Sequence, residues 1–367
     1  MALHRKNLHF YLYYSILLST STKKIWNRKE GASFLIALKR AVINLSCMIK
    51  YKTKPKKNQD LLNKHTKKKR KNGVLAYFMK SLVSEATLDL IKDCNTFMMF
   101  VGDESMENKK QHKGNSCKNR FCPICAWKKA KKDALALSVM MAYLKQEKEK
   151  EFIFLTLTAP NVKADELNDE IKHYNHSFKK LMERQEVKKI VKGYARKLEI
   201  TYNEERDDYH PHFHVLLAVN KNYFNNSWSY IKRDRWLELW QQVTKNSLIT
   251  QVDVRKVRNS KDDKVYEIAK YSAKDSDYLI NQDVFDVFYK ALKGKRLIVY
   301  SGLFKESMNL FKDGKLDEYK EKDTTKYVYA ILYNWGQSQY IEKEKRLLTE
   351  EEQKEINGQL FDEMESE

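Results

Sequence analysis

The stretch YHPHFHVLL, Tyr209–Leu217, decides how the middle of the chain folds. Side chains on an extended chain point to alternate sides, so its three histidines share one side and its apolar residues share the other. These two sets are His210, His212 and His214, and Phe213, Val215 and Leu217. Neutral imidazoles that converge at this spacing are good ligands for a divalent metal, whereas a core histidine is usually single. The stretch therefore predicts a strand that packs into a core and carries a metal site.

The segment just before this stretch, KLEITYN at Lys197–Asn203, is a second expected strand. A polar link, EERDDY, separates the two, which predicts an antiparallel hairpin. Glu199 alternates with its apolar neighbours and so faces away from them, toward the side that a histidine could share. A carboxylate suits Mg²⁺ or Mn²⁺ better than imidazoles alone, which makes Glu199 the candidate third ligand. An exposed strand glutamate is the ordinary alternative, and His210 is the alternative ligand.

The rest of the chain alternates between expected strands and helices. Further strands are predicted at residues 151–158, 250–258 and 297–300, and helices at 75–92, 126–148, 164–186, 227–244, 264–280 and 284–292. This order predicts an α+β fold with a central, mostly antiparallel five-stranded sheet and flanking helices. In the acidic tail, Thr349 and Glu352 form a capping-box pattern that predicts a short surface helix.

The charge balance points to a polyanionic partner. The 367 residues include 70 Lys plus Arg against 49 Asp plus Glu, a formal charge of +21. Residues 50–71 hold eleven basic residues and one acidic one, which predicts a disordered or loosely ordered basic arm. A solvated surface rich in lysine is the plainer alternative. The candidate DNA contacts are Lys67, Lys68, Lys69, Arg70 and Lys71 in this arm, and Lys128, Lys129, Lys131 and Lys132 further on.

Four of the five cysteines lie close together in the sequence, around the motif CKNRFCPIC. The motif gives the spacing C-x4-C-x2-C, which suits a closed tetrahedral structural Zn²⁺ better than a disulfide. The expected ligands are Cys94, Cys117, Cys122 and Cys125. His112 competes with Cys94 for the fourth position, and free buried thiols are the alternative to any metal.

A second constellation is EIAKYSAKD, residues 267–275. On a helix, Glu267, Lys270, Tyr271 and Lys274 would form one stripe, and a stripe of one carboxylate, one phenol and two ammoniums is not a core face. Beside a metal-binding strand, the Tyr271 hydroxyl could attack a phosphorus atom while the lysines offset the developing charge. Glu267 could take a proton from tyrosine or from water. Alone this stripe is a weak signal, because most of the 22 tyrosines are packing residues.

The N-terminus has a charged and then apolar pattern similar to a signal peptide, but no small-residue cleavage site follows. The apolar run has about eleven residues, whereas a membrane span needs about 20. We therefore expect a cytoplasmic protein without a membrane segment. Residues 1–47 carry no chemistry that we can name, and a native start at Met48 stays open.

Taken in order, CKNRFCPIC, FLTLTAPN, HPHFHVLL and EIAKYSAKDSDYL resemble the rolling-circle replication initiators, or Rep proteins, of small Gram-positive plasmids, within the HUH endonuclease superfamily. The resemblance covers residues 90–305. It implies that His212 and His214 hold a divalent metal, that Tyr271 is the nicking nucleophile, and that Glu267 activates water at termination. It also implies an RRM-like palm in which helices cover one face of the sheet, the metal histidines lie on a middle strand and the tyrosine lies on a helix above.

The implied reaction nicks a plasmid origin, leaves a 5′-phosphotyrosine, frees a 3′-OH primer and ends in strand transfer. The implied partners are origin DNA, both double-stranded and as the displaced single strand, with a host helicase and DNA polymerase. A homodimer is left open. Alternatives are an HUH transposase or mobilisation nuclease, or a non-enzymatic zinc-containing DNA-binding regulator.

The expected organisation has five parts, from the N-terminus to the C-terminus. They are an extension (1–47), a basic arm with a short helix (48–92), a zinc-knuckle segment (93–130), the nicking domain (131–305) and a helical C-terminal region with an acidic tail (306–367).

Overall fold

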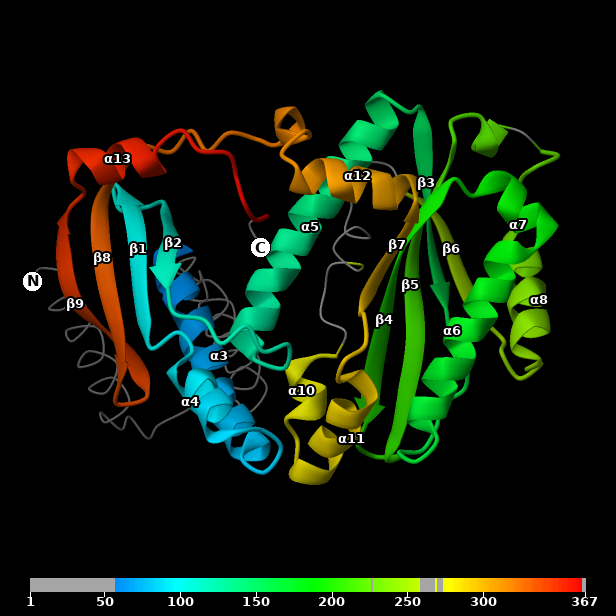
Figure 1. Ribbon diagram of the computed structural model, residues 1–367, viewed down its shortest axis with the longest axis horizontal. Coiled ribbons are helices and arrows are strands. Elements are labelled where there is room, and N and C mark those ends of the chain that lie inside the picture. Colours follow the sequence, from blue (N-terminus) through cyan, green and yellow to red (C-terminus); the bar gives the residue numbers. More distant parts are fainter. Residues whose placement is uncertain (1–56, 226, 258–267, 269–272, 365–367) are drawn as a thin grey trace, which may run out of the picture. The chain divides into compact units, whose positions relative to one another are not determined.

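The computed structural model describes residues 57–225, 227–257, 268 and 273–364. Within them the chain forms two antiparallel sheets, which Figure 1 shows with their covering helices. A four-stranded sheet has the order β2-β1-β8-β9, and a five-stranded sheet has the order β6-β3-β5-β4-β7.

The bounds of the elements are as follows. The strands are β1 (Phe97–Asp103), β2 (Lys109–Gly114), β3 (Lys150–Leu157), β4 (Gly193–Asn203), β5 (Asp208–Asn220), β6 (Val252–Val257), β7 (Ile298–Gly302), β8 (Tyr327–Gly336) and β9 (Gln339–Leu347). The helices are α3 (Lys57–Met79), α4 (Glu85–Asp93), α5 (Pro123–Gln146), α6 (Leu167–Glu183), α7 (Gln185–Ile190), α8 (Arg233–Thr244), α10 (Asp275–Tyr278), α11 (Gln282–Leu292), α12 (Leu303–Lys312) and α13 (Glu350–Ile356). Two 3-10 turns, η1 (Tyr223–Asn225) and η2 (Asp317–Tyr319), complete the list.

The five-stranded sheet confirms the central prediction from the sequence. All five of its strands overlap the stretches expected to be strands, and β5, which carries the histidines, is the middle strand. β4 and β5 form the predicted antiparallel hairpin. The apolar side of β5 packs as its alternation requires: Phe213, Val215 and Leu217 are fully buried in the same core cluster.

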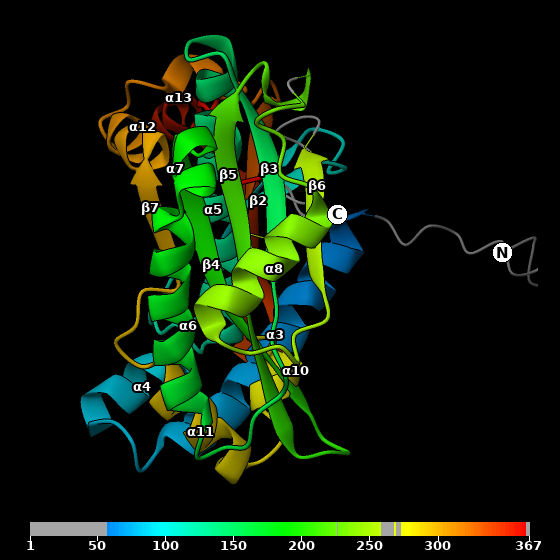
Figure 2. The ribbon, with the colours of Figure 1, turned by 90° about the vertical axis from the view of Figure 1, so that its right-hand side faces the viewer.

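Helices cover both faces of this sheet, which corrects the expectation of helices on one face. On the face of Phe213, the core includes residues of α6 and α8 such as Tyr174 and Trp240, and Figure 2 shows α6 and α8 in front of the strands. On the opposite face, which carries the histidines, Phe154 and Leu216 pack with Leu137 of α5 and Phe304 of α12. The apolar residues on the histidine face are therefore covered by α5 and α12 and are not exposed to solvent.

The aromatic packing beneath β5 holds the central strand in place. The Phe213 ring lies 5.7 Å from the Phe178 ring of α6, and the Arg196 guanidinium stacks 4.2 Å from its centroid on the same side. Full burial of a phenylalanine side chain stabilises a fold by about 1.5–3 kcal/mol. The Trp240 indole N–H, in addition, donates to the Thr158 carbonyl at 2.7 Å and ties α8 to the end of β3.

The four-stranded sheet was not predicted. We expected residues 306–367 to be helical, but this region contains the strands β8 and β9 as well as α12 and α13. The apolar run of β8 lacks a clear period because both faces of the sheet are covered: Ala330 lies in one core cluster and Ile331 in another. β9 is an edge strand rich in charge, and its Glu and Lys residues also suit the exposed side of a helix.

The basic arm is more ordered than the sequence suggested. From Lys57 onward it is helix α3 rather than a loose segment. The side chains of Leu75, Ala76 and Met79 are buried in the main core. This packing supplies the stabilisation that a run of lysines cannot provide by itself, because helices depend mainly on tertiary burial.

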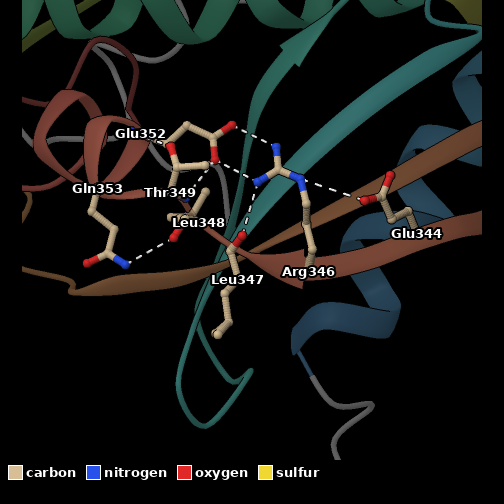
Figure 3. Close-up of polar contacts among 7 residues, drawn as sticks. All are labelled: Glu344, Arg346, Leu347, Leu348, Thr349, Glu352 and Gln353. Atoms are coloured by element: carbon tan, nitrogen blue, oxygen red, sulfur yellow. Dashed lines mark hydrogen bonds and ion pairs between the residues drawn. The ribbon is translucent and has the colours of Figure 1, made fainter.

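The capping box at α13 is confirmed. The Thr349 hydroxyl accepts from the Glu352 backbone N–H at 3.2 Å, and the Glu352 carboxylate accepts from the Thr349 backbone N–H at 2.9 Å. Figure 3 shows how Arg346, at the end of β9, adds a second tie: its two terminal nitrogens lie 2.7 Å from the two oxygens of Glu352. This bidentate pair fixes the angle between β9 and α13.

Replacement of Glu352 by Gln should destabilise the protein at neutral pH more than in acid. The Arg346 guanidinium, helped by the Thr349 N–H, lowers the pKa of Glu352 to about 2 from an ordinary value of 4.5. A lowered folded-state pKa stabilises the protein above pH 4.5, and this contribution is lost as the pH falls toward 2. Because the pair is partly exposed, we expect a loss of at most about 1 kcal/mol at pH 7.

Denaturant unfolding at pH 7 and at pH 3 measures this difference. Glu351→Gln, an exposed position on the same helix, is the matched control and should change little at either pH. A Glu352→Gln loss of equal size at both pH values would contradict the role of the charged pair.

Candidate functional site

The β4–β5 register brings the predicted metal ligands together. Glu199 pairs directly with His212 across the strands, and the next residue on the same face, His214, pairs with Lys197. The Glu199 Oε2 atom lies 3.0 Å from His214 Nε2 and 3.7 Å from His212 Nε2. The two Nε2 atoms are 3.2 Å apart. One carboxylate oxygen and two imidazole nitrogens therefore converge on a single point.

The other ring nitrogen of each histidine is held by a neighbour. His212 Nδ1 donates to the backbone carbonyl of His210 at 3.2 Å. His214 Nδ1 lies 3.2 Å from the Thr156 hydroxyl oxygen of β3, and the Phe154 ring stacks against the imidazole with centroids 5.4 Å apart. A histidine whose Nδ1 carries the proton presents the Nε2 lone pair as a ligand. Both rings are thus oriented for coordination through Nε2.

This donor set fits a small divalent cation. When Nδ1 carries the proton in both rings, both Nε2 atoms are acceptors, and the buried Oε2 of Glu199 faces them with no other hydrogen-bond donor among the described residues. Three acceptor atoms that face one another repel unless a cation lies between them. Octahedral Mg²⁺ holds its oxygens at about 2.0–2.1 Å, so ligands at right angles lie about 3.0 Å apart. The observed 3.0, 3.2 and 3.7 Å separations approach that spacing.

Burial favours the protonation states that metal binding needs. It lowers the pKa of His212 to about 4, with the nearby His214 contributing, so His212 is neutral near pH 7. Burial alone would raise the pKa of Glu199, but the adjacent His214 and His212 outweigh it and lower that pKa. The site at neutral pH is therefore an ionised carboxylate beside a neutral imidazole.

The remaining predicted residues of this site divide into three groups. His210 stacks on His212 with centroids 5.0 Å apart but is not among the three converging residues. Lys274 is exposed at the start of α10. Glu267, Lys270 and Tyr271 lie outside the described residues. Ile268, within the same segment, is fully buried in the core cluster that includes Phe154, on the histidine face of the sheet.

Sequence reasoning missed three residues around this site. Thr156 contacts His214, as described above. Lys197 is 1% exposed, pairs with His214 across the strands and contributes to the lowered pKa of Glu199. Asp277 of α10 has a raised pKa, chiefly through burial and also through the nearby Glu199. Lys197 lies two residues before Glu199 on β4, so the sequence alternation already put both side chains on the same face of the strand. Asp277 comes from a distant segment, and only the fold brings it near Glu199.

The four predicted cysteines also converge. Cys94 follows α4, Cys117 follows β2, and Cys122 and Cys125 lie at the start of α5. The Sγ atoms of Cys94 and Cys125 are 3.5 Å apart, those of Cys117 and Cys125 are 3.6 Å apart, and those of Cys94 and Cys122 are 3.7 Å apart. Zn–S bonds of about 2.3 Å in a tetrahedron give S···S separations of about 3.8 Å. The sulfur cage therefore matches tetrahedral Zn²⁺, and His112 is not part of it.

The four thiols of the cage divide into two pairs. Hydrogen bonds from neighbouring thiols, led by Cys117, lower the pKa of Cys94 and Cys125, whereas the neighbouring thiols and burial raise the pKa of Cys117 and Cys122. Cys122 is the N-cap residue of α5, where the positive end of the helix dipole favours an anion. Its sulfur also accepts from Asn72 Nδ2 at 3.4 Å. A thiolate cage of this kind carries net negative charge even around Zn²⁺, so positive neighbours stabilise it.

Two lysines that we predicted as DNA contacts supply this positive charge. Lys69 is 5% exposed, and its ammonium donates to the carbonyls of Lys92 at 2.6 Å and Cys94 at 2.7 Å. Lys128 donates to Asn95 Oδ1 at 3.2 Å, and the charges of Cys94 and Cys125 act on it. Lys69 is therefore held beside the cage by its two carbonyl contacts rather than exposed at the surface, where the DNA-contact prediction would have it. Lys128 is half-buried and also lies beside the cage.

The other predicted DNA contacts differ in whether their side chains form ion pairs with acidic residues. Lys68 and Lys71 form ion pairs with Asp275 of α10. Lys131 and Lys132 form ion pairs with Glu363 and Asp362 of the acidic tail, and Lys129 pairs with Asp133 at 2.8 Å. Lys67 and Arg70 are exposed on α3.

Comparisons with known proteins place the chain in a family. The sequence pattern of a family described as Replication protein matches residues 108–341. A curated protein named Protein rep from Staphylococcus aureus is 59% identical over 221 residues, which span 60% of this chain and 96% of that protein. Proteins of the same name from Bacillus amyloliquefaciens and Streptococcus pneumoniae are 34% and 33% identical, over 69% and 68% of this chain and 84% and 83% of theirs.

The chain therefore belongs to the Rep family of plasmid replication proteins, as its motifs indicated. No solved structure matches it. In the part of the chain that the structure describes, we find no helix with the length and apolar character of a membrane span.

Removal of one sulfur from the cage should remove one bound metal. Cys94→Ser is expected to lower the zinc content of the purified protein by about one equivalent, because an open three-sulfur cage holds Zn²⁺ less tightly than a closed one. Elemental analysis by mass spectrometry measures the loss. His112→Ala, at the competing position outside the cage, is the control and should keep its zinc. Full zinc content in Cys94→Ser would overturn the ligand assignment.

Proposed function

We propose that this protein initiates rolling-circle replication by nicking one strand of a plasmid origin through a covalent 5′-phosphotyrosine. The nick frees a 3′-OH that a host DNA polymerase extends, and strand transfer ends the cycle. The convergence of Glu199, His212 and His214 on the middle strand of the sheet carries the proposal. It supports a nuclease role because three buried metal-binding atoms that face one another are costly to maintain unless they hold an ion, and an ion at this position can act on a DNA phosphate.

Glu199, His212 and His214 would hold Mg²⁺ or Mn²⁺, and the bound ion would polarise a DNA phosphate. The protein itself holds these three side chains in the orientation that coordination requires. Thr156 and the His210 carbonyl orient the imidazoles. Lys197, buried on the same face, contributes to the lowered pKa of Glu199.

Tyr271 is the proposed nucleophile, and its hydroxyl oxygen forms the bond to phosphorus as the 3′ oxygen leaves. Lys270 and Lys274 are the proposed partners for the charge that develops on phosphate. Glu267 is the proposed base that activates water for the terminating cleavage. The described residue of this segment, Ile268, is buried in the core cluster that contains Phe154, on the same face of the sheet as the histidines.

The proposed DNA contacts are the candidates that remain accessible, chiefly Lys67, Arg70 and Lys129. Lys131 and Lys132 would first have to leave the acidic tail. The thiolate cage is proposed to hold a structural Zn²⁺ that fixes the start of α5. A host helicase is the proposed partner for strand separation.

Tyr271→Phe should abolish the covalent protein–DNA adduct, because phenylalanine has no oxygen to attack phosphorus. The assay incubates supercoiled plasmid carrying the cognate origin with Mg²⁺ or Mn²⁺ and resolves nicked DNA and protein-linked DNA on denaturing gels. Tyr278→Phe, a buried tyrosine of α10 whose hydroxyl donates to the Phe121 carbonyl, is a control that tests general loss of a phenol. An adduct that survives in Tyr271→Phe would disprove the nucleophile. A non-enzymatic DNA-binding regulator would show no nicking in either protein.

The double variant His212→Ala/His214→Ala should lose both nicking and the binding of Mn²⁺, because one carboxylate cannot hold the ion alone. Calorimetric titration with Mn²⁺ gives a readout that does not depend on activity. His210→Ala is the matched control, because it removes a stacked imidazole that lies outside the converging three. Nicking that persists after chelation of divalent ions would contradict the metal site.

A further inference from the structure

A second feature of the molecule has the composition of a nucleic-acid site and lies apart from the histidine strand. It is a groove of about 730 Å³ between α3, α4 and the β8–β9 turn. Its wall and rim include Arg70, Tyr77, Lys80, Lys92, Trp335 and Ser338, and none of the described residues that line it is acidic. We propose that this groove binds single-stranded DNA, with bases stacked on its aromatic rings and phosphates on its basic rim. This inference rests on the proposed function and names the groove as a path for the displaced plasmid strand.

The aromatic residues of the groove are placed for stacking. Tyr77 is 73% exposed, although tyrosine in a folded protein usually buries most of its ring. Trp335, at the end of β8, is held by an edge-to-face contact with Tyr340, with ring centroids 4.9 Å apart, and its backbone N–H donates to the Thr96 carbonyl at 2.7 Å. A ring held in this way loses little side-chain entropy when a base stacks on it.

Two of the basic residues, Arg70 and Lys80, are exposed and can contact phosphates. Arg70 Nε donates to the Ser338 carbonyl at 3.1 Å, which holds the exposed Arg70 side chain at the rim. Ser338 itself lies in a two-residue turn with Gln337, and both have positive φ (52° and 60°), as in the tight turns of regular hairpins. Arg70 and Lys80 have no carboxylate partner among the described residues, whereas Lys92 pairs with Asp89 at 3.0 Å.

The shape and chemistry favour a single strand over a duplex. A duplex hides the faces of its bases inside the stack, so it cannot use exposed tyrosine and tryptophan rings as platforms. The groove is concave, whereas proteins that enter the major groove of duplex DNA present a protruding helix or β-ribbon. The combination of a basic rim and sequence-tolerant stacking is typical of proteins that bind single strands without sequence preference.

The test compares the double variant Tyr77→Ala/Lys80→Ala with the unmodified protein. Fluorescence anisotropy with labelled oligothymidylate, which carries no origin sequence, measures affinity without nicking. We expect binding to weaken about tenfold and the salt dependence to decrease by about one released ion. Trp228→Ala/Lys305→Ala is the matched control: it removes an exposed aromatic (98% exposed) and an exposed lysine from other parts of the surface and should bind normally. Thermal unfolding of both variants verifies folding.

Two further measurements decide between the alternatives. Tyr77→Phe keeps the ring and should restore most of the affinity, which a general loss of polar surface would not explain. Unchanged oligothymidylate affinity in the double variant would overturn the proposal, and so would an equal loss for duplex DNA of random sequence. The two proposals are tested by different measurements. Covalent adduct formation by the unmodified protein tests the proposed nicking, and oligothymidylate affinity tests the groove, so one proposal can fail while the other holds.

Discussion

The antiparallel register between β4 and β5 is the constraint on which the site depends. It sets Glu199 opposite His212 and places His214 one step along the same face. A slip of one residue would turn Glu199 into the core that Leu198 and Ile200 now fill, and would bury a carboxylate among aromatic rings. The full burial of Phe213, Val215 and Leu217 makes that slip costly, so the apolar half of β5 holds the polar half in place.

Helix α5 connects the two candidate metal centres. Its first turn carries Cys122 and Cys125 of the thiolate cage, and its later turns pack against the histidine face of the sheet through residues such as Leu137. A structural Zn²⁺ in the cage would therefore fix the N-terminal end of a helix that also packs on the face of the sheet that carries Glu199, His212 and His214. The buried Lys69 ties α3 to the same cage, which explains how a lysine-rich segment becomes an ordered helix.

The positive charge of this protein serves more than one purpose. Lys69 and Lys128 lie beside the thiolates, Lys68 and Lys71 hold α10 through Asp275, and Lys131 and Lys132 hold the acidic tail. Among the described residues, only some lysines and arginines remain exposed without an acidic partner, and they include Arg70 and Lys80 at the rim of the aromatic groove. A basic run in the sequence thus indicates an anionic partner in general but does not tell which of its members meets that partner.

Local patterns in the sequence determined the five strands of the central sheet, the hairpin that pairs Glu199 with a histidine, the cysteine set and the capping box of α13. Each depends on neighbours within a few residues or on an alternation that only one fold can satisfy. The four-stranded sheet, the buried Lys69 and Lys197, and the approach of Asp277 to Glu199 were decided by the tertiary structure alone. Their environments come from segments far apart in the chain: β1 pairs with β8 across more than two hundred residues, and a lysine looks the same in sequence whether its ammonium meets water or a thiolate cage.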